Sequence, residues 1–566
     1  MPWMHLPLLL FLALVSASPS DSHAEIVVGL KLQRLDALEK AFWEISNPHS
    51  SQYLSFMNIT TLSEMIGPTP ATVDRARTWL LAHGADPQSL RYSALGDRIT
   101  ARVPNLLGAT VDQITNVAHG DGDFDFVLYR SGNSKVPSSQ SRPKQPFSSS
   151  SSLSSQRYSI KAQKAAYGIP NDLQASDPRT LQMVWGPGTF GYSKSQLSAF
   201  KDEQCPLLNM DKVLFDTENH GESGGDNYGE GNLDVSMIAS FGLNITTLVS
   251  NTNTSMSTEE GNGFGEAMLD FLTSLANRET LPQVLSLSLG SLSAYSCDLL
   301  CEEAEKKGHA KSDCNAFLQE QRQVCMFLTQ KQVGRISTAL QVLGVRGVSV
   351  FGSSGDGGSH FSFDRFEGGS ALADDLNEIS CSFQMPVFPT GSPYITSVGG
   401  TLWKGTLFPD PSHPVAWPRS GGGFAWQFPR PAHQDNMIKD YLQSTAGLPP
   451  PSSYNSSARG YPDVSAISED GTSQSSPTVA GIFSLLMDMR LQAGLKPLGF
   501  LGPRLYMVAE KFPGEAFQDV TEGSSAYHCD NGFPSAKGWD PVTGLGRPVW
   551  QGLMKHFASD DDTLLS

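Results

Sequence analysis

Short apolar segments that end in glycine and alternate with helical segments most constrain the fold of the larger, C-terminal part of this chain. Val284–Leu289 and Val345–Phe351 are rich in Val and Leu, and a glycine directly follows each of them. Arg335–Leu343 and Thr478–Arg490 have the character of helices, and the second begins just after a proline. Such alternation is typical of α/β proteins with parallel strands. We therefore expect an α/β fold with a mostly parallel sheet.

A smaller unit precedes this part. Residues 25–130 contain amphipathic segments at Leu35–Trp43 and Val73–His83, together with β-rich segments at Arg98–Val103 and Phe124–Tyr129. We expect these residues to form a small α+β unit of their own.

The chain begins with the pattern of a secretory signal peptide. Leu6–Val15 has the length of a signal peptide's apolar region and is too short to cross a bilayer, so we assign residues 1–17 to the signal. Residues 131–157 are rich in Ser, Pro and basic residues and lack the apolar content to order themselves. A signal, a compact unit, a cleavable linker and a large remainder at residues 158–558 are the arrangement of a zymogen.

Charge and composition exclude several classes of partner. The 566 residues carry a net charge of −17 without a long basic block, which argues against binding of nucleic acid or anionic membranes. After the signal, no stretch is long and apolar enough for a membrane anchor, and we expect a monomer. Sequons at Asn58, Asn244, Asn253 and Asn455 also indicate the secretory pathway, with a lysosomal, vacuolar or extracellular destination left open.

The seven cysteines fit an oxidising compartment. Four of them, Cys297, Cys301, Cys314 and Cys325, lie in one polar, helix-like stretch, which we interpret as two local disulfides of undetermined pairing. A zinc site is the alternative, although the spacing differs from that of paired CxxC motifs. Because seven is odd, at least one thiol is free or pairs outside the chain.

A candidate nucleophile lies in Gly471–Gly481, which reads GTSQSSPTVAG. Ser473 follows Gly-Thr and precedes an apolar helix, so its hydroxyl would lie at a helix N-terminus, where backbone N–H groups can stabilise an oxyanion. The alternative is a serine that only caps a buried helix.

A nucleophilic serine needs a base, and the sequence offers two kinds. His220 precedes Gly221 and would suit a subtilisin-type enzyme. Glu230 and Asp234 are four residues apart, so on a helix both carboxyl groups share one face, and their repulsion raises a pKa. That pair could act as a carboxylate base backed by a second acid, or could be two acids on a solvated face.

A third carboxyl group lies at Asp356, in Ser354–Gly358, directly after an expected strand. Flanking glycines let the backbone approach closely, and the C-terminal end of a strand is a common place for α/β chemistry. A simple Gly-Asp-Gly turn is the alternative.

Together these motifs resemble the sedolisin family of serine-carboxyl peptidases. Glu230-x-x-x-Asp234, Ser-Gly-Asp356 and Gly-Thr-Ser473 occur in that family's order, and further similar segments are Ser397–Thr401, Ser420–Phe424, Tyr461–Val464, Gly499–Tyr506 and Gly538–Gly544. Residues 25–130 resemble the family's activation prodomain, and residues 158–558 its subtilisin-like peptidase domain.

The resemblance implies Ser473 as nucleophile, Glu230 as general base, Asp234 as its support and Asp356 in the oxyanion hole. It implies an acid-activated peptidase, made as a zymogen, that removes tripeptides from free N-termini of peptides or unfolded proteins. An acid endopeptidase and a catalytically silent peptide-binding glycoprotein remain alternatives.

The resemblance also implies a Ca²⁺ site near the C-terminus. Its ligands would be the carboxylates of Asp519 and Asp540 and the carbonyls of Val520, Ala536 and Gly538, an oxygen shell that suits this hard cation. The Cys297–Cys325 region and Gly357–Ser380 depart from the family as enlargements. We further hypothesise that Cys381 pairs with Cys529.

Overall fold

The computed structural model describes residues 23–104, 124–130, 158–188, 190–216, 229–252, 263–321, 324–327, 329–360, 366, 368–405 and 410–560. The expected signal peptide and linker, and His220, lie outside the described residues.

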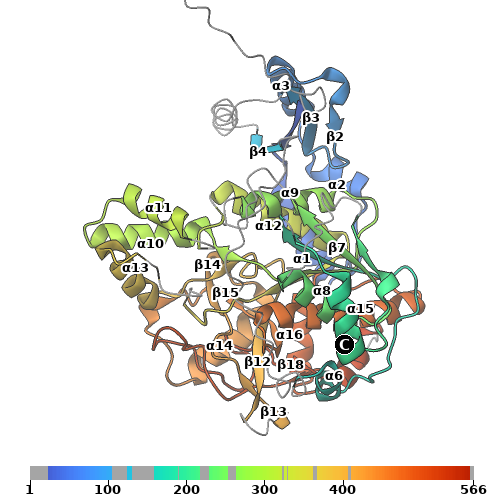
Figure 1. Cartoon of the computed structure of the whole chain (residues 1–566), viewed down its shortest axis with the longest axis vertical. Coiled ribbons are helices and arrows are strands. Elements are labelled where there is room, and N and C mark those ends of the chain that lie inside the picture. The colour runs from blue at the N-terminus through green and yellow to red at the C-terminus, as the bar shows by residue number, and fades with distance from the viewer. Residues whose placement is uncertain are drawn as a thin grey trace, which may run out of the picture.

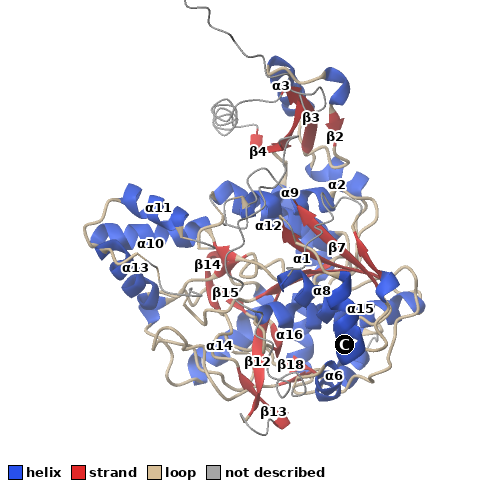
Figure 2. Ribbon diagram, in the orientation of Figure 1, coloured by secondary structure: helices blue, strands red, loops and turns tan. Residues whose placement is uncertain are grey.

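An eight-stranded sheet forms the centre of the larger part of the molecule (Figure 2). Every pairing within it is parallel except the one between the edge strand β13 and its neighbour β12. In spatial order the strands are β13 (Asp410–Ala416), β12 (Thr396–Lys404), β10 (Ser349–Ser353), β8 (Val284–Leu287), β5 (Leu181–Pro187), β7 (Thr246–Thr252) and β6 (Val213–Phe215), while β16 (Val464–Ile467) pairs with β12. The expected α/β class with a mostly parallel sheet is confirmed.

Helices cover both faces of this sheet. The helices are α6 (Ile160–Tyr167), α7 (Lys194–Gln204), α8 (Gly229–Phe241), α9 (Phe264–Ala276), α10 (Ala294–Lys306), α11 (Lys311–Glu320), α12 (Gln330–Val345), α13 (Ala371–Ser382), α14 (Asp435–Ser444), α15 (Thr472–Gln492), α16 (Gly502–Lys511) and α17 (Trp550–Phe557). Short strands complete the inventory: β9 (Ser291–Leu292), β11 (Val387–Phe388), β14 (Gly423–Pro429), β15 (Ala458–Tyr461), β17 (Phe517–Gln518) and β18 (Arg547–Pro548). Successive residues of β5 alternate between two cores: Val184 packs with α8 and α15, whereas Met183 and Trp185 pack with α9 and α12.

Two expected boundaries are wrong in position. The segment expected as a strand at Val345–Phe351 begins with the last residue of α12, and the strand itself is β10. Helix α15 begins at Thr472 rather than after Pro477, so the proline lies inside the helix. Proline lacks the N–H that would bond to the carbonyl four residues earlier, and that carbonyl belongs to Ser473.

The small α+β unit is present, as the sequence predicts. Its antiparallel sheet has the order β2 (Arg91–Tyr92), β3 (Arg98–Pro104), β1 (His23–Leu30) and β4 (Phe124–Arg130), and its helices are α1 (Leu35–Ser46), α2 (Ile59–Ile66) and α3 (Pro70–Ala82). The sheet lies at the top of the molecule, and α1 reaches down to the larger part (Figure 1).

The two units share one hydrophobic core. Phe42 of α1 is completely buried among side chains of α9 and α12, and a Cβ at Gly344 would come within 2.5 Å of its ring. Ion pairs cross the same boundary, from Arg98 to Asp270 at 2.5 Å and from Asp97 to Arg335. The burial of apolar side chains stabilises this association.

Disulfides anchor the lobe formed by α10, α11 and α13, which projects to the left in Figure 1. Cys297 pairs with Cys325 and Cys301 with Cys314, which confirms two local disulfides and shows that the zinc alternative is wrong. Cys381 pairs with Cys529, as hypothesised, and Cys205 is free and buried. Among the helices of the described ranges, none is both long and apolar enough to cross a membrane.

The shared core yields a prediction for the stability of the precursor. Phe42→Ala should lower its unfolding free energy by about 3–5 kcal/mol, because a buried aromatic ring leaves a cavity. The matched control is Leu35→Ala in the same helix, since Leu35 is 43% exposed and should cost little. Chemical denaturation of the full-length precursor measures both variants, and equal stability of the two would contradict a shared core.

Candidate active site

The candidate nucleophile lies at the start of α15. Ser473 is the second residue of this helix and is half-buried, while its neighbours Thr472 and Gln474 are buried. Gly471 precedes the helix with φ +89°, and a Cβ there would lie 2.6 Å from Oδ2 of Asp356. Glycine is therefore required both by the backbone conformation and by the close approach of the third carboxyl group.

Helix α8 presents the two acids that are four residues apart. Glu230 is in its first turn and Asp234 is completely buried one turn later, and α8 packs along α15 (Figure 1). Gly231 permits the close approach of the loop between β5 and α7, because a Cβ there would overlap the carbonyl oxygen of Gly191 at 1.8 Å. The shared face expected from the spacing thus points into the interior rather than into solvent.

Burial controls the ionisation of this pair. It raises the pKa of Glu230 to about 7, against a side-chain hydrogen bond with Ser473 that lowers it, and the charge of Asp356 raises it further. Burial also raises the pKa of Asp234 well above its usual range, and the charge of Glu230 adds to this effect. Oε1 of Glu230 and Oδ2 of Asp234 are buried and have no hydrogen-bond partner among the described residues. Two such oxygens on adjacent turns suit a proton held between them.

Asp356 follows β10 and reaches the same helix terminus from the other side. Its Oδ1 accepts hydrogen bonds of 2.8 Å from both the backbone N–H and the hydroxyl of Thr472. Burial raises the pKa of Asp356, against these two donors and the charge of Arg419. The Arg419 side chain itself donates to the backbone carbonyl of Asp356 at 3.1 Å, which holds the loop rather than the carboxyl group.

The structure therefore brings Ser473, Glu230 and Asp356 together, with Asp234 behind Glu230. Serine, a carboxylate base and a carboxylic acid beside a helix N-terminus can perform acyl transfer if protons are suitably distributed. The arrangement holds three acids near one hydroxyl, and the charge of Arg419 acts on Asp356 among them.

Sequence reasoning missed Ser288. It lies directly after β8, and its hydroxyl donates to Oδ1 of Asp234 at 2.7 Å. Its carbonyl accepts from the Ser473 hydroxyl at 3.3 Å, and its own hydroxyl lies 3.5 Å from the Ser473 carbonyl that Pro477 leaves without a helical partner. Ser288 thus contacts both the supporting acid and the nucleophile. The only available signal was a small polar residue at the end of an apolar strand.

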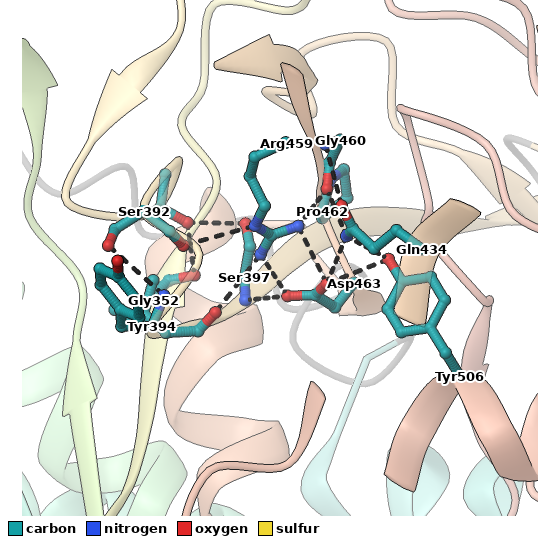
Figure 3. A network of polar contacts seen from close by, with 12 residues as sticks. Gly352, Ser392, Tyr394, Ser397, Gln434, Arg459, Gly460, Pro462, Asp463 and Tyr506 are labelled. Atoms are coloured by element: carbon teal, nitrogen blue, oxygen red, sulfur yellow. Dashed lines mark hydrogen bonds and ion pairs between the residues drawn. The ribbon is translucent and has the colours of Figure 1, made fainter. Parts of the chain in front are cut away.

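A buried ion pair fixes the strands on which the site depends (Figure 3). Asp463 accepts from both terminal nitrogens of Arg459, at 2.6 and 3.0 Å, and from the backbone N–H of Ser397 at 2.8 Å. The hydroxyl of Tyr506 donates to it at 3.1 Å. Ser397 belongs to β12, which pairs with β10, and Asp463 precedes β16, which leads to Gly471. The network therefore holds the strands that deliver Asp356 and Ser473.

The residues expected to hold Ca²⁺ lie together near the C-terminus. Oδ2 of Asp519 accepts from the N–H of Gly538 at 2.8 Å, and Oδ2 of Asp540 accepts from the N–H of Ala536 at 3.0 Å. Burial raises the pKa of Asp519, and burial with the charge of Asp519 raises the pKa of Asp540 to about 7. Within the described ranges no group of three or more His, Cys, Asp or Glu residues could hold a metal, so a cation here would also need carbonyl ligands.

Comparisons with known proteins agree with these observations. Residues 13–138 match the family described as Pro-kumamolisin, activation domain. This span is wider at both ends than the expected 25–130 and overlaps the expected signal peptide. The chain is 28% identical to tripeptidyl-peptidase 1 of Macaca fascicularis over 96% of this chain and 93% of that protein. It is 27% identical to that of Homo sapiens, with the same coverage, and 28% identical to that of Mus musculus, covering 94% and 92%.

Among solved structures, a Pseudomonas sedolisin complexed with pseudo-iodotyrostatin is similar, with a TM-score of 0.47, 18% identity, and coverage of 70% of this chain and 96% of that one. The resemblance to the sedolisin family is confirmed, and the chain is a relative of tripeptidyl-peptidase 1 that carries a pro-kumamolisin activation domain.

Proposed function

We propose that this zymogen matures at acid pH into a serine-carboxyl peptidase that releases tripeptides from the free N-termini of peptides or unfolded proteins. Its relatives support a serine-type peptidase, and tripeptide release follows the activity in the relatives' name. The observation that carries the proposal is the gathering of Glu230 and Asp356 about the hydroxyl of Ser473. Such a set has no purpose in a silent peptide-binding glycoprotein.

In the proposed reaction Glu230 removes the proton of the Ser473 hydroxyl as its oxygen bonds to the scissile carbonyl carbon. The carbonyl oxygen becomes an oxyanion, which accepts hydrogen bonds from the backbone N–H of Ser473 and the carboxylic acid of Asp356. When the C–N bond breaks, Glu230 returns the proton to the leaving amine. Water then attacks the acyl-enzyme by the same route and frees the acid product.

Asp234 supports Glu230 by sharing a proton with it. The hydroxyl of Ser288 donates to Oδ1 of Asp234, so a proton carried by Asp234 belongs on Oδ2, the oxygen with no partner among the described residues. Ser288 is in this sense a positioning residue, which orients the acid pair without touching substrate.

Acid is required because a carboxyl group donates a hydrogen bond only while protonated. The raised pKa values of Asp234 and Asp356 keep their protons to higher pH than in exposed acids. As pH rises above the raised pKa of Asp356, its carboxyl group ionises and the oxyanion hole loses this donor. An ionised Asp356 would then repel the developing oxyanion.

We also propose that a Ca²⁺ ion stabilises the C-terminal region. Oδ1 of Asp519 is buried without a hydrogen-bond partner among the described residues, and the two carboxylates raise each other's energy when ionised. A cation held by Asp519, Asp540 and the carbonyls of Val520, Ala536 and Gly538 would relieve both. This ion would supply structural charge rather than chemistry at Ser473. The disulfides fit a secretory-pathway protein, for which we propose a lysosomal, vacuolar or extracellular destination.

Ser473→Ala should lower kcat by at least about a thousandfold with little change in the melting temperature, because the variant loses the nucleophile but only a half-buried hydroxyl with a long hydrogen bond of 3.3 Å to Ser288. His220→Ala is the control for a subtilisin-type base and should keep activity nearly unchanged. Hydrolysis of a tripeptide coumarylamide by acid-matured protein measures both. Near-total loss in His220→Ala would overturn the assignment of Glu230 as the base.

The raised pKa values predict that the rate falls as the pH rises. We expect kcat/KM of the mature enzyme to fall at least about tenfold between pH 5 and pH 8, while circular dichroism shows that it stays folded. The loss should reverse on return to pH 5. Equal rates at the two pH values would contradict a protonated oxyanion donor.

Removal of calcium should destabilise the protein, because an ion bound only by the folded state stabilises it. A chelator should lower the melting temperature of the wild type by several degrees, and added Ca²⁺ should restore it. Asp519→Asn should have the lower melting temperature from the outset, and neither the chelator nor added Ca²⁺ should change it. A melting temperature of the wild type that ignores chelation would refute the calcium site.

A further inference from the structure

An exopeptidase needs two features that the catalytic groups do not provide: a closed end of the substrate cleft and a group that binds the free amino terminus. The segment that begins at Ser288 has neighbours that suit both. This residue contacts Ser473, and Ser291 lies three residues further along the chain. Three extended residues span about 10 Å, which is also the length of an extended tripeptide.

The disulfide-anchored insertion closes the far end of this segment. The backbone N–H of Leu292 donates to the carbonyl of Val324 at 3.0 Å, and the N–H of Met326 donates to the hydroxyl of Ser291 at 3.1 Å. Cys325, between these two insertion residues, is bonded to Cys297 of α10. The enlargement that distinguishes this chain in sequence therefore ends directly against the segment.

Glu266 lies next to this closure. The N–H of Gly265 donates to the carbonyl of Met326 at 3.2 Å, and a Cβ at Gly265 would come within 2.7 Å of that oxygen and of the Gln332 side chain. Glycine thus allows the first turn of α9 to approach the insertion closely, and Glu266 is the following residue. Hydrogen bonds thus join the start of α9 to Met326 and Met326 to Ser291, which lies three residues along the chain from Ser288, the residue that contacts the nucleophile.

The carboxyl group of Glu266 is incompletely paired. Gln332 interacts with it, but Oε2 is buried and has no hydrogen-bond partner in the described part of the chain, where Glu266 also makes no ion pair. Burial raises its pKa. The rings of Phe264 and Phe327 lie nearby with centroids 5.5 Å apart, and Phe327 packs on Phe388 at 4.8 Å. An unpaired acid among apolar groups is costly and favours a cationic ligand.

We propose that Glu266 binds the α-ammonium group of the substrate and so determines both the requirement for a free N-terminus and the tripeptide length. The inference rests on the proposed function. A substrate with its scissile carbonyl at Ser473, extended beside Ser288–Ser291, places the N-terminus of its third residue at the closed end. There the ammonium group supplies the hydrogen bond and the charge that Oε2 of Glu266 lacks. A longer N-terminal extension meets the insertion.

The test compares a tripeptide coumarylamide that has a free amine with its N-acetylated form, using acid-matured enzyme. Glu266→Gln keeps the size of the side chain and removes its charge. It should reduce the preference for the free amine, expressed as a ratio of kcat/KM values, at least tenfold through a higher KM. Cleavage of the acetylated form should be unchanged. The matched control is Asp298→Asn, an exposed acid on α10, and this variant should keep the wild-type ratio.

Glu266→Met is a second variant, whose apolar side chain is compatible with burial. It allows the test to proceed if Glu266→Gln folds poorly. Either variant that matures and retains the wild-type preference overturns the role of Glu266 while leaving the peptidase proposal intact. Equal cleavage of the two substrates by the wild type would instead overturn exopeptidase action and, with it, this inference. Loss of the preference in both variants, with acetylated substrate still cleaved, is the supporting result.

Discussion

The burial of three neighbouring carboxyl groups is the constraint on which this site depends. Glu230, Asp234 and Asp356 surround one hydroxyl, burial raises the pKa of each, and the charge of Arg419 acts on Asp356 alone among them. Removing all three protons would place three negative charges close together where burial weakens their solvation. The folded protein therefore favours a protonated site, and the chemistry that we propose uses those retained protons as hydrogen-bond donors.

The fold delivers these groups from separate parts of the chain, and few backbone positions tolerate change. Gly471 makes room for the Asp356 carboxyl group, and Pro477 frees the Ser473 carbonyl by withholding a helical hydrogen bond. The ion pair of Arg459 and Asp463 holds β12 against β16, which leads to Ser473, and β12 in turn pairs with β10, which leads to Asp356. In the precursor, side chains of the activation domain also pack into one hydrophobic core with α9 and α12. Release of that domain must therefore expose apolar surface.

Sequence reasoning could find the groups that occur in short, chemically distinctive motifs. Glu230 and Asp234 were recognisable by their spacing, and Ser473 and Asp356 by their glycine-rich surroundings. Alternating apolar segments were sufficient for the class of the sheet, but strand and helix ends depend on tertiary contacts, which explains the misplaced start of α15. The pairing of the clustered cysteines needed three-dimensional positions, since spacing alone permits several connectivities.

Ser288 and Glu266 illustrate what sequence could not provide. A serine at the end of an apolar strand and a glutamate in the first turn of a helix are ordinary residues at ordinary places. Their significance comes from partners far away in sequence, Asp234 for Ser288 and the Met326 region for Glu266. Only the juxtaposition of β8, α9 and the insertion shows that they lie at opposite ends of one short segment.

Difference infrared spectroscopy of the carboxyl C=O stretch tests directly whether the buried acids keep their protons at working pH. Spectra of mature Ser473→Ala protein, with and without the further substitution Asp234→Asn or Asp356→Asn, isolate the band of each acid. We expect both bands at pH 5 to be those of protonated carboxylic acids, and to convert to carboxylate bands only at pH values above those at which exposed carboxyl groups ionise. Carboxylate bands for both residues already at pH 5 would contradict this expectation.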